Sequence, residues 1–171
     1  MTDDNYRATT PGSAPGPDPS NPAPADRTVS VSRVVAAPAG AIFDVLADPT
    51  LHRVIDGSGT VRDGRDGNPD RLFRGARFSM GMRMGVPYRT TSEVTEFEEG
   101  RLIAWRHFGH HVWRYELEPV DGGTRVTETF DWGTSRFPPL YEWLNLPDRH
   151  RTSMVETLAR LDRHVTAGDA A

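Results

Sequence analysis

The sequence predicts an α+β fold in which a curved antiparallel sheet of about seven strands wraps around one long C-terminal helix. Three observations support this fold class. Residues 147–165 are the only segment that is long and periodic enough for a substantial helix. Two short helical patterns follow a first β-branched segment, and a series of strand-like segments separated by turn signals comes after them.

The C-terminal helix is predicted from one apolar stripe with a 3.6-residue period: Met154, Leu158, Leu161 and Val165. Pro147 suits the first turn, where its missing N–H costs nothing, and Asp148 places a carboxylate at the positive end of the helix dipole. A single amphipathic helix cannot bury its stripe alone. We therefore expect the strands to supply the surface on which it lies.

The first strand is expected at residues 28–37, followed by a short helix that ends at Asp48–Pro49 and one further turn at residues 50–53. Six more strands are expected at residues 55–62, 72–84, 86–97, 102–108, 112–119 and 124–132, and a short helix at residues 140–146. Short turns join most of these strands, so the pairing should be antiparallel. A strongly bent sheet around a helix often leaves a cavity.

Composition excludes several classes of chemistry. The chain has no cysteine, which rules out disulfides, thiolate nucleophiles and cysteine-based metal sites. All 20 basic residues are arginine, so Schiff-base chemistry on lysine is also excluded. The net charge of −4 gives no basic face for nucleic acid.

Residues 1–27 are rich in proline and small polar residues and are expected to form a disordered tail, with residues 168–171 as a disordered end. The domain itself is expected at residues 28–167. No apolar run approaches the length of a membrane span, and the N-terminus has no apolar signal-peptide region. These features predict a cytoplasmic protein.

Four segments carry a resemblance to a known family: Ala37–Pro38 followed by AGAIFDVLADP, then EFEEGRLIAW, then YELEPVDGGTRVTETF, and last MVETLARLDRHV. Together they cover about residues 28–166. In order and pattern they resemble the START-like, Bet v 1-like helix-grip superfamily (SRPBCC), most closely its bacterial polyketide cyclase/dehydrase–lipid transport branch. The resemblance implies a hydrophobic cavity between sheet and helix that holds an apolar or aromatic small molecule, without a cofactor. It does not imply one chemistry.

Strand parity predicts the side chains that face this cavity, provided that no bulge shifts the register. Leu117 and Val126 have polar or charged neighbours along their strands and are taken as inward. The expected ligand-binding residues are Met80, Met82, Met84, Tyr88, Thr90, Trp105, Trp113, Tyr115, Phe130, Trp132, Met154 and Leu158. Methionine suits an adaptable pocket and the aromatic rings suit a planar ligand, although both also serve as ordinary core.

His107 and Glu128 are the candidate catalytic residues. Desolvation would raise the pKa of a buried carboxyl group, and a nearby imidazole could exchange a proton with it. The alternative is a satisfied structural pair, or Glu128 paired with an arginine. His110 and His111 stand near His107, but side chains around a hairpin alternate faces and no carboxylate lies within two positions, so no metal site is expected.

Three functions are consistent with these features. The first is a binding protein for a hydrophobic or aromatic small molecule, lipid-like or polyketide-like. The second is a polyketide cyclase/dehydrase in which His107 and Glu128 act as an acid–base pair and a tyrosine orients the substrate. The third is a protein-interaction module with a filled core and an exposed apolar patch. The sequence leaves the ligand open, as well as the choice between monomer and homodimer.

Overall fold

The computed structural model describes residues 27–64 and 67–168. Apart from Arg27 and Gly168, the two terminal segments that we expect to be disordered lie outside these residues. Seven strands form one sheet in this part of the chain: β1 (Thr28–Val35), β2 (Val61–Gly64), β3 (Arg77–Met84), β4 (Val86–Glu98), β5 (Leu102–His107), β6 (Val112–Val120) and β7 (Gly123–Asp131). They lie in the order β1-β7-β6-β5-β4-β3-β2, and every neighbouring pair is antiparallel.

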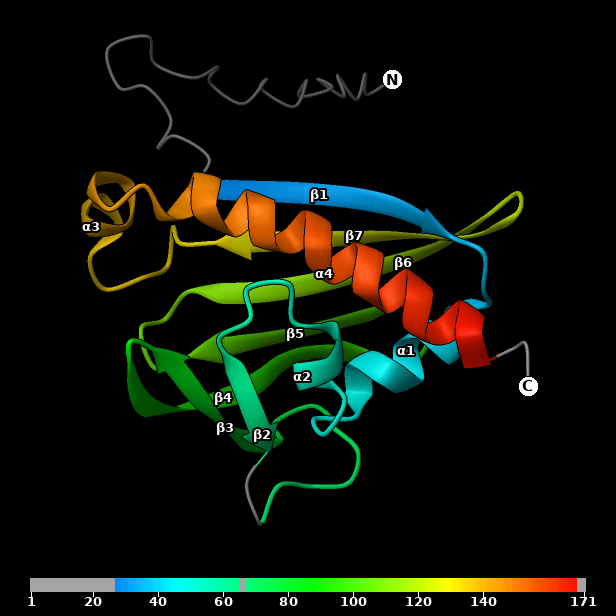
Figure 1. The fold of residues 1–171 in the computed structure, drawn as a ribbon, viewed down its shortest axis with the longest axis horizontal. Coiled ribbons are helices and arrows are strands. Elements are labelled where there is room, and N and C mark those ends of the chain that lie inside the picture. The colour runs from blue at the N-terminus through cyan, green and yellow to red at the C-terminus, as the bar shows by residue number, and fades with distance from the viewer. Residues whose placement is uncertain (1–26, 65–66, 169–171) are drawn as a thin grey trace, which may run out of the picture.

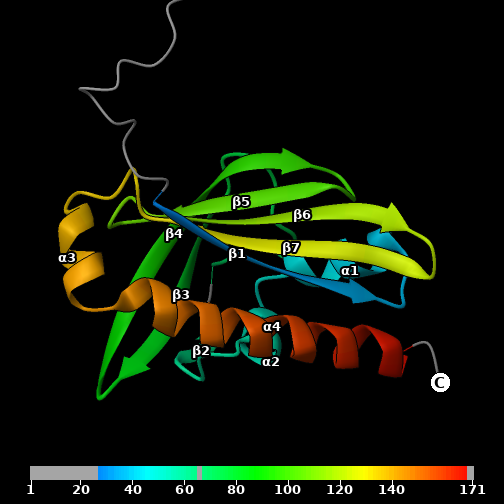
Figure 2. The same cartoon turned by 90° about the horizontal axis from the view of Figure 1, so that it is seen from above.

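Four helices accompany the sheet in the same residues: α1 (Ala39–Ala47), α2 (His52–Ile55), α3 (Pro138–Trp143) and α4 (Leu146–Gly168). In Figure 1, α4 crosses the sheet, with α1 near its C-terminal half, α2 near its middle and α3 at its N-terminal end. Figure 2 shows β5, β6, β7 and β1 forming one layer, while β3 and β2 turn towards α4. The curved sheet thus closes around the helix, and the predicted α+β architecture is confirmed.

Bends in the strands produce this curvature. In β4 the pairing with β5 shifts register between Val94 and Glu96, so one extra residue is accommodated there. Such a bulge bends a strand and increases its twist. β4 is joined to β3 at Gly85, whose φ of 76° lies in the left-handed region that glycine adopts without strain. The β2–β3–β4 end of the sheet therefore leans over the helix.

The apolar stripe of α4 is buried along its whole length, as predicted: Met154, Leu158, Leu161 and Val165. The last three residues belong to a solid core that also contains Phe43 and Leu46 of α1. Met154 instead packs with Phe130 and Trp132 in a second, smaller cluster. The C-terminal half of α4 therefore covers a filled core, and its N-terminal half lies over a different region.

One expected strand is wrong. Residues 55–62 do not form a continuous strand, because α2 ends at Ile55 and β2 begins only at Val61. The carboxylate of Asp56 holds the intervening loop by accepting hydrogen bonds from the backbone N–H groups of Ser58 and Val61. In addition, Gly57 donates its N–H to the Thr157 hydroxyl on α4 at 3.0 Å. These contacts satisfy the loop backbone without a strand partner.

A candidate ligand-binding cavity

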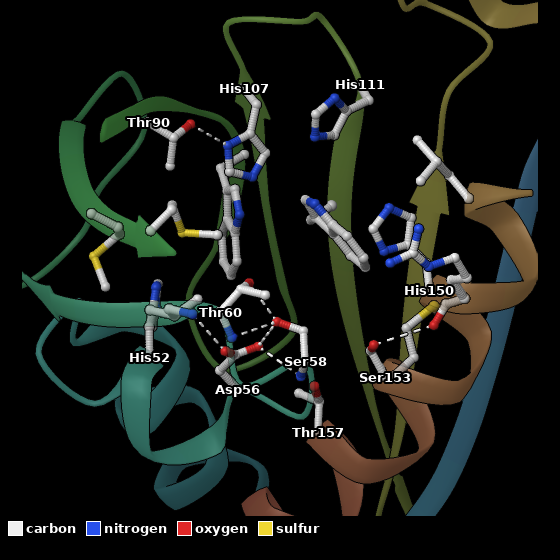
Figure 3. Close-up of a pocket in the computed structure, with 18 of the residues that line it drawn as sticks. His52, Asp56, Ser58, Thr60, Thr90, His107, His111, His150, Ser153 and Thr157 are labelled. Atoms are coloured by element: carbon white, nitrogen blue, oxygen red, sulfur yellow. Dashed lines mark hydrogen bonds between the residues drawn. The ribbon is translucent and has the colours of Figure 1, made fainter. Parts of the chain in front are cut away.

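A cavity of about 520 Å³ lies between the sheet and the N-terminal half of α4. Its wall is contributed by α2, by the α2–β2 loop, by β2 to β7, by α3 and by the first turns of α4. Figure 3 shows His107 and His111 at one end of it, His52 and Asp56 at the other, and His150 and Ser153 projecting from α4. Most of the wall is apolar, as is typical of small-molecule sites.

Most of the predicted ligand-binding residues and both candidate catalytic residues are in the cavity wall: Met80, Met82, Tyr88, Thr90, Trp105, His107, Trp113, Tyr115, Glu128 and Met154. Trp105 is central among them. Its ring stacks on His52 at a centroid distance of 5.0 Å and packs against Tyr115 at 5.4 Å. The wall at this point is a continuous aromatic surface on which a planar ligand could stack.

Three predicted ligand contacts are not in the wall. Phe130 is fully buried behind it, with centroid distances of 4.8 Å to Trp113 and 4.4 Å to His150. Trp132 stacks on Phe130 and donates its indole N–H to Glu142 of α3. Leu158 lies beyond Thr157, the last wall residue of α4, and belongs to the solid core. Met84 ends β3, and its side chain is outside the described part of the structure.

Other wall residues were not predicted as ligand contacts: His52, Asp56, Ser58, Thr60, Phe108, His111, Leu140, Tyr141, Leu144, Arg149, His150, Ser153 and Thr157 among them. Helical spacing could have found those on α4, because His150 lies one turn before Met154 and Thr157 follows it by three residues. The loop and α3 residues have no such local signal. They reach the cavity only through long-range packing.

Two of the histidines stack at the β5–β6 hairpin. The rings of His107 and His111 lie 4.8 Å apart. Nδ1 of His107 is 3.1 Å from the hydroxyl oxygens of both Thr90 and Ser92, and Nδ1 of His111 is 2.9 Å from the Tyr141 hydroxyl. Burial, and after it the neighbouring imidazoles, lowers the pKa of His107 to about 3.

The same physical causes act on His111 and His150. Burial and the proximity of His150 lower the pKa of His111 to about 4. Burial and the positive charge of Arg149 lower the pKa of His150 to about 4. These imidazoles are therefore neutral at physiological pH. In the described residues, no group of three or more histidine, aspartate or glutamate side chains is arranged to hold a metal ion.

Glu128 is a buried carboxylic acid in the cavity wall. It faces Tyr115 across β6 and β7, and the Tyr115 hydroxyl donates a 2.7 Å hydrogen bond to its Oε1. Oε2 is buried and has no hydrogen-bond partner among the described residues. Burial raises the pKa of Glu128 to about 8, although the bond from Tyr115 acts in the opposite direction.

His107 and Glu128 share the cavity but do not form a pair. The strand registers place Glu128 level with Tyr115, and Tyr115 level with Ile103 on β5. His107 lies four residues beyond Ile103 along β5, which corresponds to roughly 13 Å at about 3.3 Å per residue. The two side chains therefore stand at different ends of the cavity.

A sheet that closes on a long C-terminal helix around an apolar cavity defines a ligand-binding domain of the helix-grip superfamily. The chain belongs to the polyketide cyclase/dehydrase and lipid transport family, whose model matches residues 26–166. No helix in the described residues is long and apolar enough to cross a membrane.

The chain is also similar to other bacterial proteins. The chain is 40% identical over 148 residues to Rv0088, an uncharacterized protein of Mycobacterium tuberculosis; the match covers 83% of this chain and 66% of the relative, slightly less than two thirds of its length. Among solved structures, a Mycobacterium smegmatis protein has 20% identity and a TM-score of 0.66 over 84% of this chain and 93% of its own. The Polyketide_cyc-like protein of Corynebacterium glutamicum has 23% identity and a TM-score of 0.57, and the match covers 85% of this chain and 95% of that protein. These two similarities support the fold alone.

Proposed function

We propose that this domain binds a hydrophobic or aromatic small molecule in the cavity between the sheet and α4. The observation that carries the proposal is the cavity itself, at about 520 Å³ and lined mostly by aliphatic, methionine and aromatic side chains. Pockets of this size and character bury most of a drug-sized molecule. The thioethers of Met80, Met82 and Met154 would let the wall adapt to the shape of the ligand.

Catalysis by His107 and Glu128 as one acid–base pair is less well supported. An acid and a base that serve one reacting atom must both come within hydrogen-bond reach of it. The offset of roughly 13 Å along β5 argues against that arrangement. The two groups would instead contact opposite ends of a bound molecule.

The interaction-module alternative rests on an exposed apolar patch around α3. It comprises Phe108, Phe137, Leu140, Trp143 and Leu144, of which Trp143 is 80% exposed. Phe108, Leu140 and Leu144 also line the cavity. The patch thus borders the cavity entrance, and the core beneath it is hollow rather than filled, so it does not favour a ligand-free module.

Titration with the fluorescent apolar probe N-phenyl-1-naphthylamine tests the proposal. Ser153 lines the cavity, so Ser153→Trp should fill it and weaken probe binding by at least about tenfold. Thr152→Trp is the matched control, because Thr152 is exposed and its hydroxyl makes the same bond to the carbonyl four residues earlier. Absence of saturable binding, or equal loss in both variants, would contradict the proposal.

A further inference from the structure

Among the described residues, Glu128 is the only buried carboxylic acid, with 2% of its surface exposed. The Tyr115 hydroxyl donates a hydrogen bond to Oε1 of Glu128, while Oε2 has no hydrogen-bond partner among these residues. No arginine or histidine forms an ion pair with it in this part of the chain. A buried polar atom without a partner is rare in folded proteins and costs free energy.

No hydrogen bond within the described residues uses this atom. An apolar pair of similar volume at positions 115 and 128 would fill the same space without the desolvation cost. The other carboxylate of the cavity differs, because Asp56 accepts hydrogen bonds at both oxygens, from Ser58 and Val61. Of these two carboxylates in the described cavity wall, only Glu128 therefore keeps an oxygen without a hydrogen-bond partner.

The protonation state decides what Glu128 can offer. Its pKa of about 8 keeps the carboxyl group neutral near pH 7. Oε1 accepts the hydrogen bond from Tyr115, which is the role of the carbonyl oxygen of a neutral acid. The proton then belongs on Oε2, so the unpartnered atom is a donor. A neutral buried acid that donates a hydrogen bond is an effective recognition group for a ligand oxygen.

We propose that Glu128 donates a hydrogen bond from Oε2 to a neutral carbonyl oxygen at the buried end of the ligand. This assignment rests on the proposed function of the cavity and names its ligand class: apolar or aromatic molecules that carry a ketone, ester or amide carbonyl. The walls formed by Trp105 and Trp113 then hold the apolar body.

A matched pair of probes tests the donor. Fluorenone and fluorene have nearly the same planar shape and differ by a single carbonyl oxygen. We expect the wild-type domain to bind fluorenone about tenfold more tightly than fluorene in equilibrium dialysis near pH 6.5. Glu128→Gln should keep this preference, since the amide N–H₂ can donate in place of the acid. Glu128→Met has a similar length and no donor, and should abolish it.

The pH dependence adds a second readout. The wild-type preference should disappear near pH 9, where Glu128 loses its proton, and Glu128→Gln should retain it there. The titratable or charged groups of the same cavity are Asp56, Tyr88, His52, His107, His111, Tyr115, Tyr141, Arg149 and His150. Burial lowers the pKa values of the four histidines and raises those of the three tyrosines. None of these seven groups is therefore expected to mimic a loss near pH 8.

The outcomes separate the two proposals. If fluorenone binds the wild-type domain no more tightly than fluorene, or if Glu128→Met keeps the preference, the assignment of Glu128 is overturned. Binding of N-phenyl-1-naphthylamine by the same preparation would leave the cavity function standing. Failure of all three probes to bind would overturn both. A preference that strengthens above pH 8 would identify an acceptor carboxylate and also overturn the donor assignment.

Discussion

Tyr115 and Glu128 face each other across β6 and β7, and their 2.7 Å hydrogen bond places a buried polar pair in the wall of the cavity. Both side chains are buried. The bond stabilises the ionised form of Glu128, whereas desolvation stabilises the neutral form and is the larger influence. The proton on Glu128 is therefore coupled to folding as well as to ligand binding.

Replacing Tyr115 with phenylalanine should show how much the hydrogen bond to Glu128 offsets the free-energy cost of burying that carboxyl group. The Tyr115→Phe variant leaves both carboxyl oxygens of Glu128 unpartnered, so the free energy of unfolding should fall by about 1–3 kcal/mol near pH 6. Urea unfolding followed by circular dichroism measures it. The double variant Tyr115→Phe/Glu128→Met removes both polar partners and should be less destabilised than Tyr115→Phe alone. A double variant at least as unstable as the single one would contradict this account.

Stability should fall as pH rises towards 8. The pKa of Glu128 is about 8 in the folded state and near its ordinary value of 4.5 when unfolded, so the folded state binds more protons between these limits. The free energy of unfolding therefore decreases through this window, by on the order of a few kcal/mol in total. Urea midpoints of the wild type should decline from pH 6.5 to 8.5, while those of Glu128→Gln should stay nearly level. If the urea midpoints of both proteins changed with pH in parallel, Glu128 would not be the group that titrates in this window.

The cavity histidines give the free energy of unfolding the opposite pH dependence in acid, where stability falls as pH falls. His107, His111 and His150 have folded-state pKa values of about 3 to 4, below the ordinary 6.5, so the unfolded state binds more protons as pH falls from 6.5 to 4. Their contribution to stability is present above pH 6.5 and is lost through this window. Together with Glu128, they predict a stability maximum near pH 6.5.

His150→Phe tests the acid side of this maximum. The phenyl ring can keep the packing against Phe130 and Trp113, and it removes one of the three groups that must be protonated on unfolding in acid. The difference in unfolding free energy between pH 7 and pH 4.5 should shrink by on the order of 2 kcal/mol. Urea titrations at the two pH values supply the measurement. A difference equal to that of the wild type would show that His150 is not buried as a neutral imidazole.

The fold and part of the cavity could be predicted because they depend on local periodicity. The stripe through Met154 and Leu161 marks the buried face of α4, and period-two alternation places Met80, Trp105 and Tyr115 inward. The bulge between Val94 and Glu96 leaves this prediction intact, because it lies beyond the wall residues Tyr88 and Thr90 on β4.

The remainder of the site depends on pairing and packing between distant segments. Parity places His107 and Glu128 on the same face, but only the strand register shows that they stand far apart along it. Asn145 adopts a left-handed conformation, with φ of 52°, in the connection that brings α3 to α4 and to the hairpin. No sequence period signals that turn, and none signals that Tyr141 of α3 lines the cavity.

Gly57 offers a test of the contact that fixes the α2–β2 loop. A Cβ atom at this position would overlap with the backbone oxygen of Ser153 and the backbone nitrogen of Thr157, neither of which can move without displacing α4. Gly57→Ala should therefore destabilise the fold by at least about 1–3 kcal/mol and weaken N-phenyl-1-naphthylamine binding, because the loop lines the cavity. Gly40→Ala is the control: nothing lies near its Cβ position in α1, and it should gain up to about 1 kcal/mol from helix propensity. If Gly57→Ala unfolds at the wild-type urea concentration, the loop is not held against α4 in this way.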